Sequence, residues 1–256
     1  MKYALVIGGS RGLGLATVQK LASEGIPVIA IHRDFKKDMP RVLESFQAFK
    51  ALAVPFHAIH SDAIRKTDSI ITRIKEILGE GGKIGFLVHS IARGNVKPMT
   101  PGSESASLTT DDFIITGQAM AYNLYTWVRS LDREGLFADD TRILAFTSEG
   151  NKRVIPGYGA VAAAKASLEA IVRQIAVEFA DRGIRANCIQ AGVTDTDSLR
   201  RIPDSRRIME ASLRRNPFKR LTQPADVANA VYLLCQKEAS WITGNIIKAD
   251  GGESLC

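Results

Sequence analysis

A regular alternation of short apolar runs and amphipathic stretches constrains the fold of this chain most strongly. The apolar runs, which we interpret as strands, lie near residues 3–8, 27–32, 53–59, 84–89, 141–147, 184–190 and 244–248. The amphipathic stretches, which we interpret as helices, lie near 12–24, 40–51, 66–79, 111–134, 158–181 and 224–237. Polar and apolar residues do not alternate within the first four apolar runs, so both faces of these strands should be covered. The pattern predicts an α/β fold with a doubly wound parallel sheet of about seven strands and helices on both faces.

Two stretches fit this alternation badly, and both follow the carboxyl ends of predicted strands. They span residues 93–110 and 193–217. Open α/β sheets bind their ligands at this edge. We therefore expect both stretches to be substrate loops, with loop or short-helix structure. No linker, repeat or low-complexity tract is visible, so residues 1–256 are expected to form a single domain.

Composition excludes several classes of protein. No apolar run approaches the roughly 18 residues of a membrane span, and the first residues enter a strand-like run without a signal peptide. The three cysteines have no metal-binding spacing, and an odd number of them without a signal peptide predicts reduced thiols and a cytoplasmic location. The four histidines also show no ligand spacing, so no metal site is expected. The net charge of +7 allows phosphate-bearing or acidic ligands, but no nucleic-acid-reading motif is present.

A glycine-rich turn joins the first predicted strand to the first predicted helix. Gly8 suits the positive φ of a tight turn, Gly12 allows close approach of a diphosphate, and Gly14 allows the helix to pack on the strand. The helix N-terminus offers free N–H groups to an anion. In this strand–turn–helix context the pattern predicts a Rossmann-type dinucleotide site rather than a plain turn. Its residues are Gly8, Ser10, Arg11, Gly12, Leu13 and Gly14.

The second predicted strand ends in His32 and Arg33 rather than in the acidic residue that holds the ribose of NAD. Arg33 and Arg11 could both bind a ribose 2′-phosphate, or both could be solvated surface arginines. Asp34 is a complication, because it could reach a ribose if the turn is displaced. We predict NADPH as the cofactor in preference to NADH.

Tyr158 and Lys165 stand seven positions apart in a run of small apolar residues. Seven residues are nearly two helical turns, so both fall on one helix face. A lysine in a cleft lowers the pKa of a nearby phenol and binds ribose hydroxyls. The alternative, a helix-start tyrosine and a solvated lysine, does not explain the small residues around Lys165.

Over its whole length the chain resembles the short-chain dehydrogenase/reductase family. The resemblance rests on GGSRGLG (8–14), SDA (61–63), VHSIA (88–92), YGAVAAAKASLEA (158–170), GIRANCIQAGVTDT (183–196), NPFKRLTQPADVANAVYLL (216–234) and ITGNIIKADGG (242–252). Most members separate the tyrosine and lysine by four positions, and position 162 is here alanine. The longer spacing, together with VHSIA, is similar to the bacterial enoyl-acyl-carrier-protein reductases, and AGVTDTDSLRRIP (191–203) to their NADPH-using branch.

The resemblance implies a role for each matching residue. Tyr158 would hydrogen-bond the thioester oxygen as it becomes an enolate, and Lys165 would hold the nicotinamide ribose. Asp62 and Ala63 would meet the adenine. Ser90, Ile91 and Ala92 would line the adenosine and the nicotinamide ribose. Val193 and Thr196 would hold the carboxamide and diphosphate end.

Several positions depart from the family pattern. Ile7 and Ala191 replace a common threonine and proline, and Ala145 stands where ketone-reducing members place a serine. Ser148 stands where enoyl reductases often carry a second tyrosine, and Ser148 or Thr147 could assist the oxyanion. Gln118 lies near the position of an asparagine that holds a proton-relay water in ketone reducers.

These observations predict an NADPH-dependent enoyl-thioester reductase of fatty-acid or related synthesis. A carbonyl reductase or alcohol dehydrogenase, and a non-catalytic dinucleotide sensor, remain as alternatives. Eight basic side chains between 200 and 220 could receive an acidic acyl carrier protein or the phosphates of coenzyme A, or could be a solvated helix face. The family resemblance implies a homotetramer.

Overall fold

The computed structural model describes residues 1–50, 52–100 and 107–256, and it contains the predicted sheet. Seven strands lie in the order β3-β2-β1-β4-β5-β6-β7, and every neighbouring pair is parallel. Strand order reverses between β1 and β4, the position at which sheets of this kind bind ligands. The strands are β1 (Lys2–Ile7), β2 (Val28–His32), β3 (Phe56–His60), β4 (Lys83–His89), β5 (Phe137–Ser148), β6 (Ile184–Ala191) and β7 (Ile246–Ala249).

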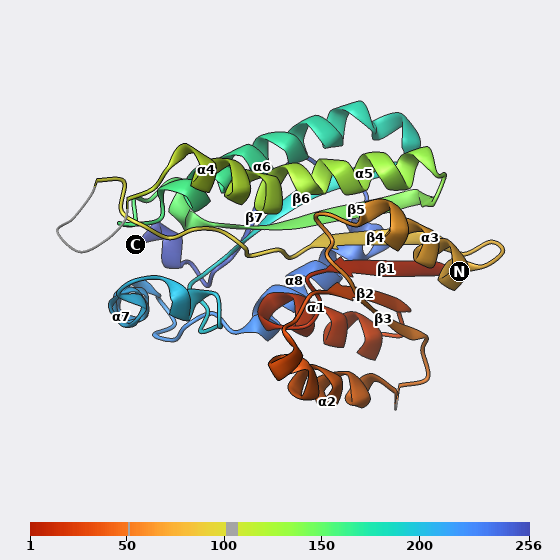
Figure 1. The fold of residues 1–256 in the computed structure, drawn as a ribbon, viewed down its shortest axis with the longest axis horizontal. Helices are drawn as coiled ribbons and strands as arrows, with labels where there is room; N and C mark the ends of the chain where they lie inside the picture. Colours follow the sequence, from red (N-terminus) through yellow and green to blue (C-terminus); the bar gives the residue numbers. More distant parts are fainter. Residues whose placement is uncertain (51, 101–106) are drawn as a thin grey trace.

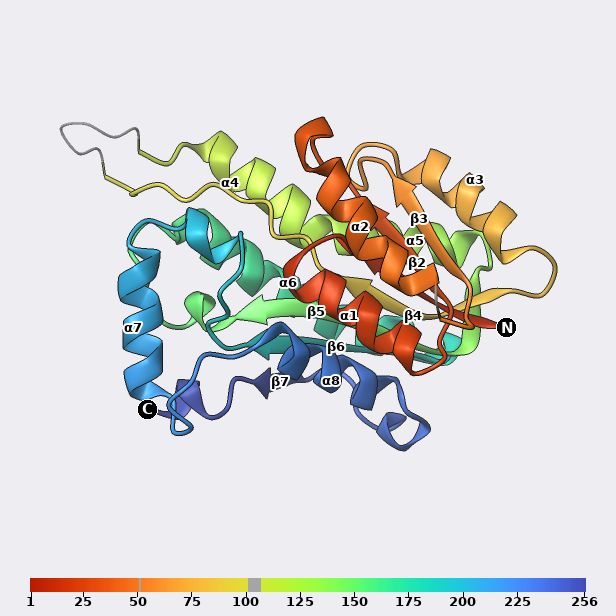
Figure 2. The same ribbon diagram turned by 90° about the horizontal axis from the view of Figure 1, so that it is seen from below.

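Helices cover both faces of the sheet, which confirms the doubly wound architecture (Figure 1). One face packs against α3 (Thr67–Leu78), α5 (Asn123–Arg133) and α6 (Gly159–Glu178). The other packs against α1 (Gly12–Ser23), α2 (Met39–Lys50) and α8 (Pro224–Cys235), and in Figure 2 α1 lies between the other two. In the described part of the chain, every helix is too short or too polar to cross a membrane.

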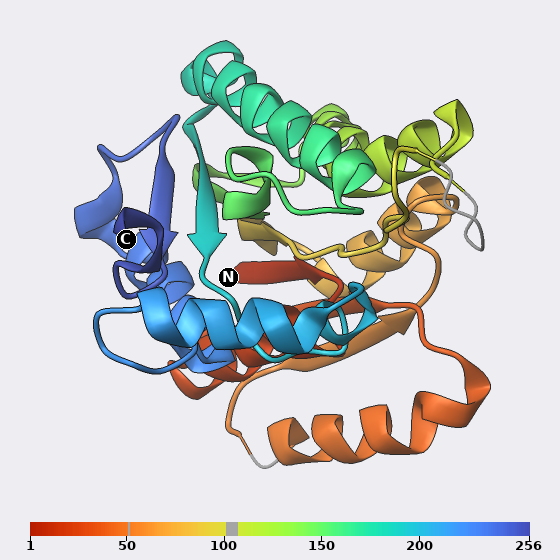
Figure 3. The ribbon, with the colours of Figure 1, turned by 90° about the vertical axis from the view of Figure 1, so that its left-hand side faces the viewer.

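The stretch 193–217 is more regular than predicted. After one helical turn at Leu199–Arg201 it forms α7 (Ser205–Arg215), which crosses the carboxyl edge of the sheet (Figure 3). Ser212 on this helix is fully buried, whereas Arg206 and Arg207 are exposed. The helix therefore has one covered face. Of the other predicted substrate loop, residues 101–106 lie outside the described residues.

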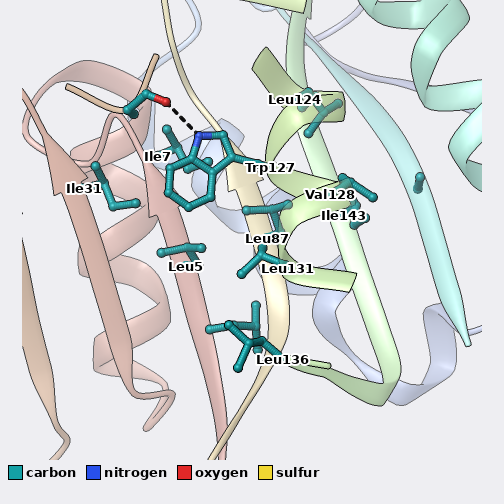
Figure 4. Close-up of a cluster of buried hydrophobic side chains, with 14 of the residues drawn as sticks. Leu5, Ile7, Ile31, Leu87, Leu124, Trp127, Val128, Leu131, Leu136 and Ile143 are labelled. Atoms are coloured by element: carbon teal, nitrogen blue, oxygen red, sulfur yellow. Dashed lines mark hydrogen bonds between the residues drawn. The ribbon is translucent and has the colours of Figure 1, made fainter. Parts of the chain in front are cut away.

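The predicted helix at 111–134 is interrupted. It consists of α4 (Thr110–Gly117), a π-helical stretch at Gln118–Tyr122, and α5. Just past the interruption, Asn123 is fully buried, and its side-chain amide donates to the Ala63 carbonyl at 3.0 Å. The Trp127 indole N–H donates to the same carbonyl at 3.0 Å, within the core shown in Figure 4. These two contacts fix the loop after β3 against α5.

Candidate active site

The glycine-rich turn has the geometry that a diphosphate requires. Gly8 has φ +88°, and a Cβ at this position would collide with the backbone carbonyl of Ser90. A Cβ at Gly14 would collide with the carbonyl of Gly8, so α1 packs directly on the turn. Because α1 begins at Gly12, the N–H groups of its first residues have no partner within the helix. Such N–H groups at the end of β1 are available to an anion.

The loop after β6 closes the other side of this site. A Cβ at Gly12 would lie 3.4 Å from Cγ2 of Thr196. Thr196 is therefore next to the α1 N-terminus, as its expected role at the diphosphate end requires. The backbone N–H of Val193, by contrast, donates to the Glu253 carboxylate at 3.1 Å. The Val193 N–H is therefore not free to bind a carboxamide. The neighbouring Thr194, which the sequence did not single out, is also buried.

The residues expected at the adenosine also converge. Ser90 continues β4, and its N–H donates to the Ile7 carbonyl at 2.8 Å. Ile91 packs on the apolar cluster beside the Tyr158 ring, and Ala92 is exposed. Asp62 accepts the N–H of Ile64 at 2.9 Å. These positions all follow the carboxyl ends of β3 and β4.

Both arginines predicted at the 2′-phosphate make ion pairs. Arg33 contacts Asp62 at 2.9 Å, and half of its side chain is exposed. Arg11 contacts Asp34 at 2.8 Å, Asp38 at 2.9 Å and Asp197 at 3.4 Å. Neither is merely a solvated surface arginine, and Arg11 is the more restrained of the two.

Tyr158 immediately precedes α6, and its ring faces the apolar cluster of Ala119, Met120, Val161 and Ala164. Its hydroxyl lies 3.3 Å from the Ser148 hydroxyl at the end of β5. The ring passes so close to Gly150 that a Cβ there would collide with it. Burial raises the pKa of Tyr158, and the hydrogen bond with Ser148 opposes this shift. The phenol is thus kept protonated at neutral pH.

Lys165 is a buried cation on the face of α6 that packs against β5. Its side chain is almost inaccessible, and its ammonium donates to the Phe146 carbonyl at 2.6 Å. Burial lowers the pKa of Lys165 to about 8, while Cys188 and Glu169 act in the opposite direction. A solvated surface lysine would have neither property, so that interpretation of Lys165 is wrong.

The expectation that Lys165 lowers the pKa of Tyr158 is also wrong for this state of the protein. Burial dominates, and the phenol pKa moves upward. The ammonium of Lys165 acts instead on His89, whose pKa falls to about 3 through burial and the nearby lysine charge. His89 is therefore neutral, and it lies 3.3 Å from the Asn123 side-chain oxygen.

Three further side chains are candidates to bind the oxyanion or to hold a proton-relay water. Ser148 contacts Tyr158 and remains a candidate. The Thr147 hydroxyl donates to Glu169 at 2.7 Å instead, away from the phenol. Gln118 is exposed, whereas Met120, two residues later, is buried beside Val161. Asp112, Thr116 and Met120 are buried at four-residue spacing, so this face of the helix is the one directed inward, and Gln118 lies outside it.

Arg215 ties α7 to the site in a way that the sequence did not indicate. Its guanidinium donates to Glu149 at 3.1 and 3.2 Å and to the Glu253 carboxylate at 2.9 Å. Glu149 directly follows Ser148, and Glu253 accepts the Val193 N–H. One arginine thus links α7, the end of β5 and the loop after β6.

The basic cluster between residues 200 and 220 divides into two groups. Arg200, Arg215 and Arg220 are ion-paired with Asp195, with Glu149 and Glu253, and with Asp226, respectively. The remaining five side chains are exposed, which leaves a basic surface on and beside α7: Arg201, Arg206, Arg207, Arg214 and Lys219.

Comparison with known proteins agrees with this fold. A family model described as Enoyl-(Acyl carrier protein) reductase matches residues 7–254. The chain is 32% identical over 199 residues to Enoyl-[acyl-carrier-protein] reductase [NADH] 1 of Rhizobium meliloti (strain 1021), covering 77% of this chain and 71% of that protein. It is 29% identical over 253 residues to 3-oxoacyl-[acyl-carrier-protein] reductase FabG of Staphylococcus epidermidis, covering 98% of each.

A solved structure extends the likeness to three dimensions. The crystal structure of Enoyl-[acyl-carrier-protein] reductase (NADH) from Aquifex aeolicus VF5 superposes with a TM-score of 0.84 at 27% identity, covering 100% of this chain and 97% of that one. The sheet, the family model and these relatives define an oxidoreductase of the doubly wound α/β class. The chain belongs to the short-chain dehydrogenase/reductase family, and the model it matches is that of the enoyl-acyl-carrier-protein reductases.

Proposed function

We propose that this protein reduces the carbon–carbon double bond of trans-2-enoyl thioesters with NADPH. The glycine-rich turn and Thr196 would hold the diphosphate, and Lys165 would hold the nicotinamide ribose. Asp62 and Ala63 would contact the adenine. The backbone atoms of Gly8, Gly14 and Ser90 are packed so closely that no side chain fits between them, as is required where a ligand binds close to the backbone. The bound nicotinamide supplies a hydride to the β-carbon of the substrate.

Tyr158 would stabilise the charge that this reaction creates. Hydride addition to the β-carbon moves an electron pair onto the thioester oxygen, and the resulting enolate then takes a proton at its α-carbon. Because the pKa of Tyr158 is raised by burial, its hydroxyl stays protonated and can donate to that oxygen. The buried ammonium of Lys165 would add a positive charge to this part of the site.

The observation that carries this proposal is the apolar wall beside the Tyr158 ring. Met120, Val161 and Ala164 are buried against it, and Ala145 supplies no hydroxyl from β5. An acyl thioester gains from apolar contact, and a delocalised enolate needs fewer donors than an alkoxide does. The relative from Rhizobium meliloti carries enoyl reduction, with NADH, in its name, which supports the enoyl part of the proposal.

One specific contact favours carbonyl reduction as the second candidate. The Ser148 and Tyr158 hydroxyls lie 3.3 Å apart, so both could donate to one ketone oxygen. Ser148 could thereby replace the serine that is absent at Ala145. The similarity to a 3-oxoacyl-[acyl-carrier-protein] reductase is in line with this alternative.

The surroundings of the site suggest how the substrate is delivered. We propose that the five exposed basic side chains on and beside α7 receive an acidic acyl carrier protein. We further propose that residues 1–256 act as one cytoplasmic catalytic domain and assemble as a homotetramer. Mass measurement in solution tests the assembly.

A comparison of four rates tests the proposed reaction. Purified protein is mixed with crotonyl or acetoacetyl thioester, and oxidation of NADPH or NADH is followed. We expect the crotonyl thioester with NADPH to give the highest rate. Faster reduction of the acetoacetyl thioester would establish the carbonyl-reductase alternative, and equal use of both cofactors would refute the predicted preference.

A further inference from the structure

Asp34 has no free carboxylate face for a ligand. Its Oδ1 accepts the Nε–H of Arg11 at 2.8 Å, and its Oδ2 lies 2.8 Å from Nδ1 of His32. The Ser10 hydroxyl also contacts it. Only 4% of the side chain is exposed. An acidic residue that binds the two hydroxyls of an adenosine ribose must present its oxygens to the groove, and Asp34 does not.

The contact through Nε instead fixes the orientation of Arg11. A guanidinium held at Nε presents its two terminal nitrogens, Nη1 and Nη2, as a fork on the opposite side. Here Nη2 meets Asp38 at 2.9 Å and Nη1 meets Asp197 at 3.4 Å. These two carboxylates are 28% and 40% exposed, whereas the Asp34 side chain is almost completely buried. The fork therefore points toward solvent, where a ligand can displace its two carboxylate partners.

The space beside the fork is suited to a phosphate. A cavity of about 350 Å³ is lined by Arg11, Phe35, Lys37, Asp38, Asp197, Arg200 and Arg201. Four of these residues are cations and two are anions. A phosphate dianion entering this cavity would compete with Asp38 and Asp197 for the fork, while the buried Asp34 would keep its hold on Nε.

His32 completes the arrangement. It is buried at the end of β2, with its ring 5.0 Å from that of His60. Burial lowers the pKa of His32, so near neutral pH it is an uncharged hydrogen-bond donor to Asp34 rather than a competing cation. The charge of Asp34 is thus directed to Arg11.

We propose that Asp34, held by His32, is a positioning residue that presents the Arg11 fork to the ribose 2′-phosphate of NADPH and does not bind a ribose diol. The proposal rests on the NADPH preference in the proposed function and does not depend on the enoyl substrate. It makes Asp34 a determinant of preference for the phosphorylated cofactor, although an acidic residue after β2 usually indicates NAD.

Calorimetric titration with 2′,5′-ADP and with 5′-ADP tests this role without any substrate. We expect the unmodified protein to bind 2′,5′-ADP more tightly, and Asp34→Asn to weaken that binding by roughly tenfold or more, the usual loss for a charge-assisted contact. Affinity for 5′-ADP should stay the same. The matched control Asp38→Asn removes an exposed competitor for the same fork, so it should preserve or tighten binding of 2′,5′-ADP.

The Asp34→Glu variant covers the case in which Asp34→Asn does not fold. Glutamate can also accept a ribose diol, but its longer stem misplaces the brace, so we expect the same selective loss. Parallel weakening of both ligands, weakening of 5′-ADP alone, or no change would overturn the proposal. The enoyl-thioester assay is independent, because a protein that fails to reduce crotonyl thioester can still show this pattern of binding.

Discussion

Replacing Tyr158 by phenylalanine separates the catalytic from the structural contribution of this residue. The phenyl ring keeps its packing against Met120 and Val161. Removing the hydroxyl costs only its 3.3 Å contact with the Ser148 hydroxyl, which is long for an O–H···O bond. Such a loss costs about 1 kcal/mol of stability or less. One oxyanion donor contributes about 2.7–4 kcal/mol to a transition state, or roughly two to three orders of magnitude in kcat.

The assay is NADPH oxidation with crotonyl thioester, accompanied by thermal unfolding and NADPH titration. We expect kcat of Tyr158→Phe to fall by roughly 100-fold or more, with Tm and NADPH affinity nearly unchanged. Ser148→Ala is the matched control, because it removes the same hydrogen bond but leaves the phenol. For enoyl reduction it should lower kcat far less than Tyr158→Phe does. A loss below about tenfold in Tyr158→Phe would refute an oxyanion role.

Three other measurements address the cofactor site and the packing of α7. The pKa of Lys165 is about 8, and the charged form is the one that binds ribose, so NADPH affinity should fall as pH rises through this value. The Lys165→Met variant should bind NADPH weakly and without that pH dependence. An NADPH affinity of the unmodified protein that does not change with pH would contradict this. Gly14→Ala should abolish NADPH binding and lower Tm, since the new Cβ collides with backbone, and normal binding would show that the turn adjusts. Arg215→Met should lower the free energy of unfolding by about 3–5 kcal/mol in a denaturant titration, because the buried Glu253 carboxylate loses its ion-pair partner. A loss under about 1 kcal/mol would mean that Glu253 finds another cation.

The architecture was predictable because it depends on local periodicity. Buried strands such as β1 and β4 are continuous apolar runs in the sequence, and the segments between consecutive strands are long enough for at least one helix each. The glycine turn was also predictable from local sequence, because the positive φ at Gly8 and the close packing at Gly14 each exclude a side chain. The placement of Lys165 in a tightly packed helix face also followed from the small residues around it.

The details that failed depend on contacts between distant segments. The Arg215 network joins residues 66 and 38 positions apart in the chain, so no local pattern signals it. Gln118 lies near the relay position by its place along the chain, but the buried face of the helix passes through Thr116 and Met120 and leaves Gln118 exposed. The side-chain partners of Asp34 come from the turn after β1 and from the end of β2, so its place in the chain alone left open whether it could reach a ribose.

The relative rate of enoyl and 3-oxo reduction tests the central claim most directly. Crotonyl and acetoacetyl thioesters of the same carrier are supplied at equal concentration, and NADPH oxidation by the unmodified protein is followed for each. The site described here, with one phenol, a buried lysine and an alanine at position 145, predicts reduction of the crotonyl thioester and little or none of the acetoacetyl thioester. Faster reduction of the acetoacetyl thioester would contradict the assignment and would identify Ser148 and Tyr158 as a ketone-reducing pair.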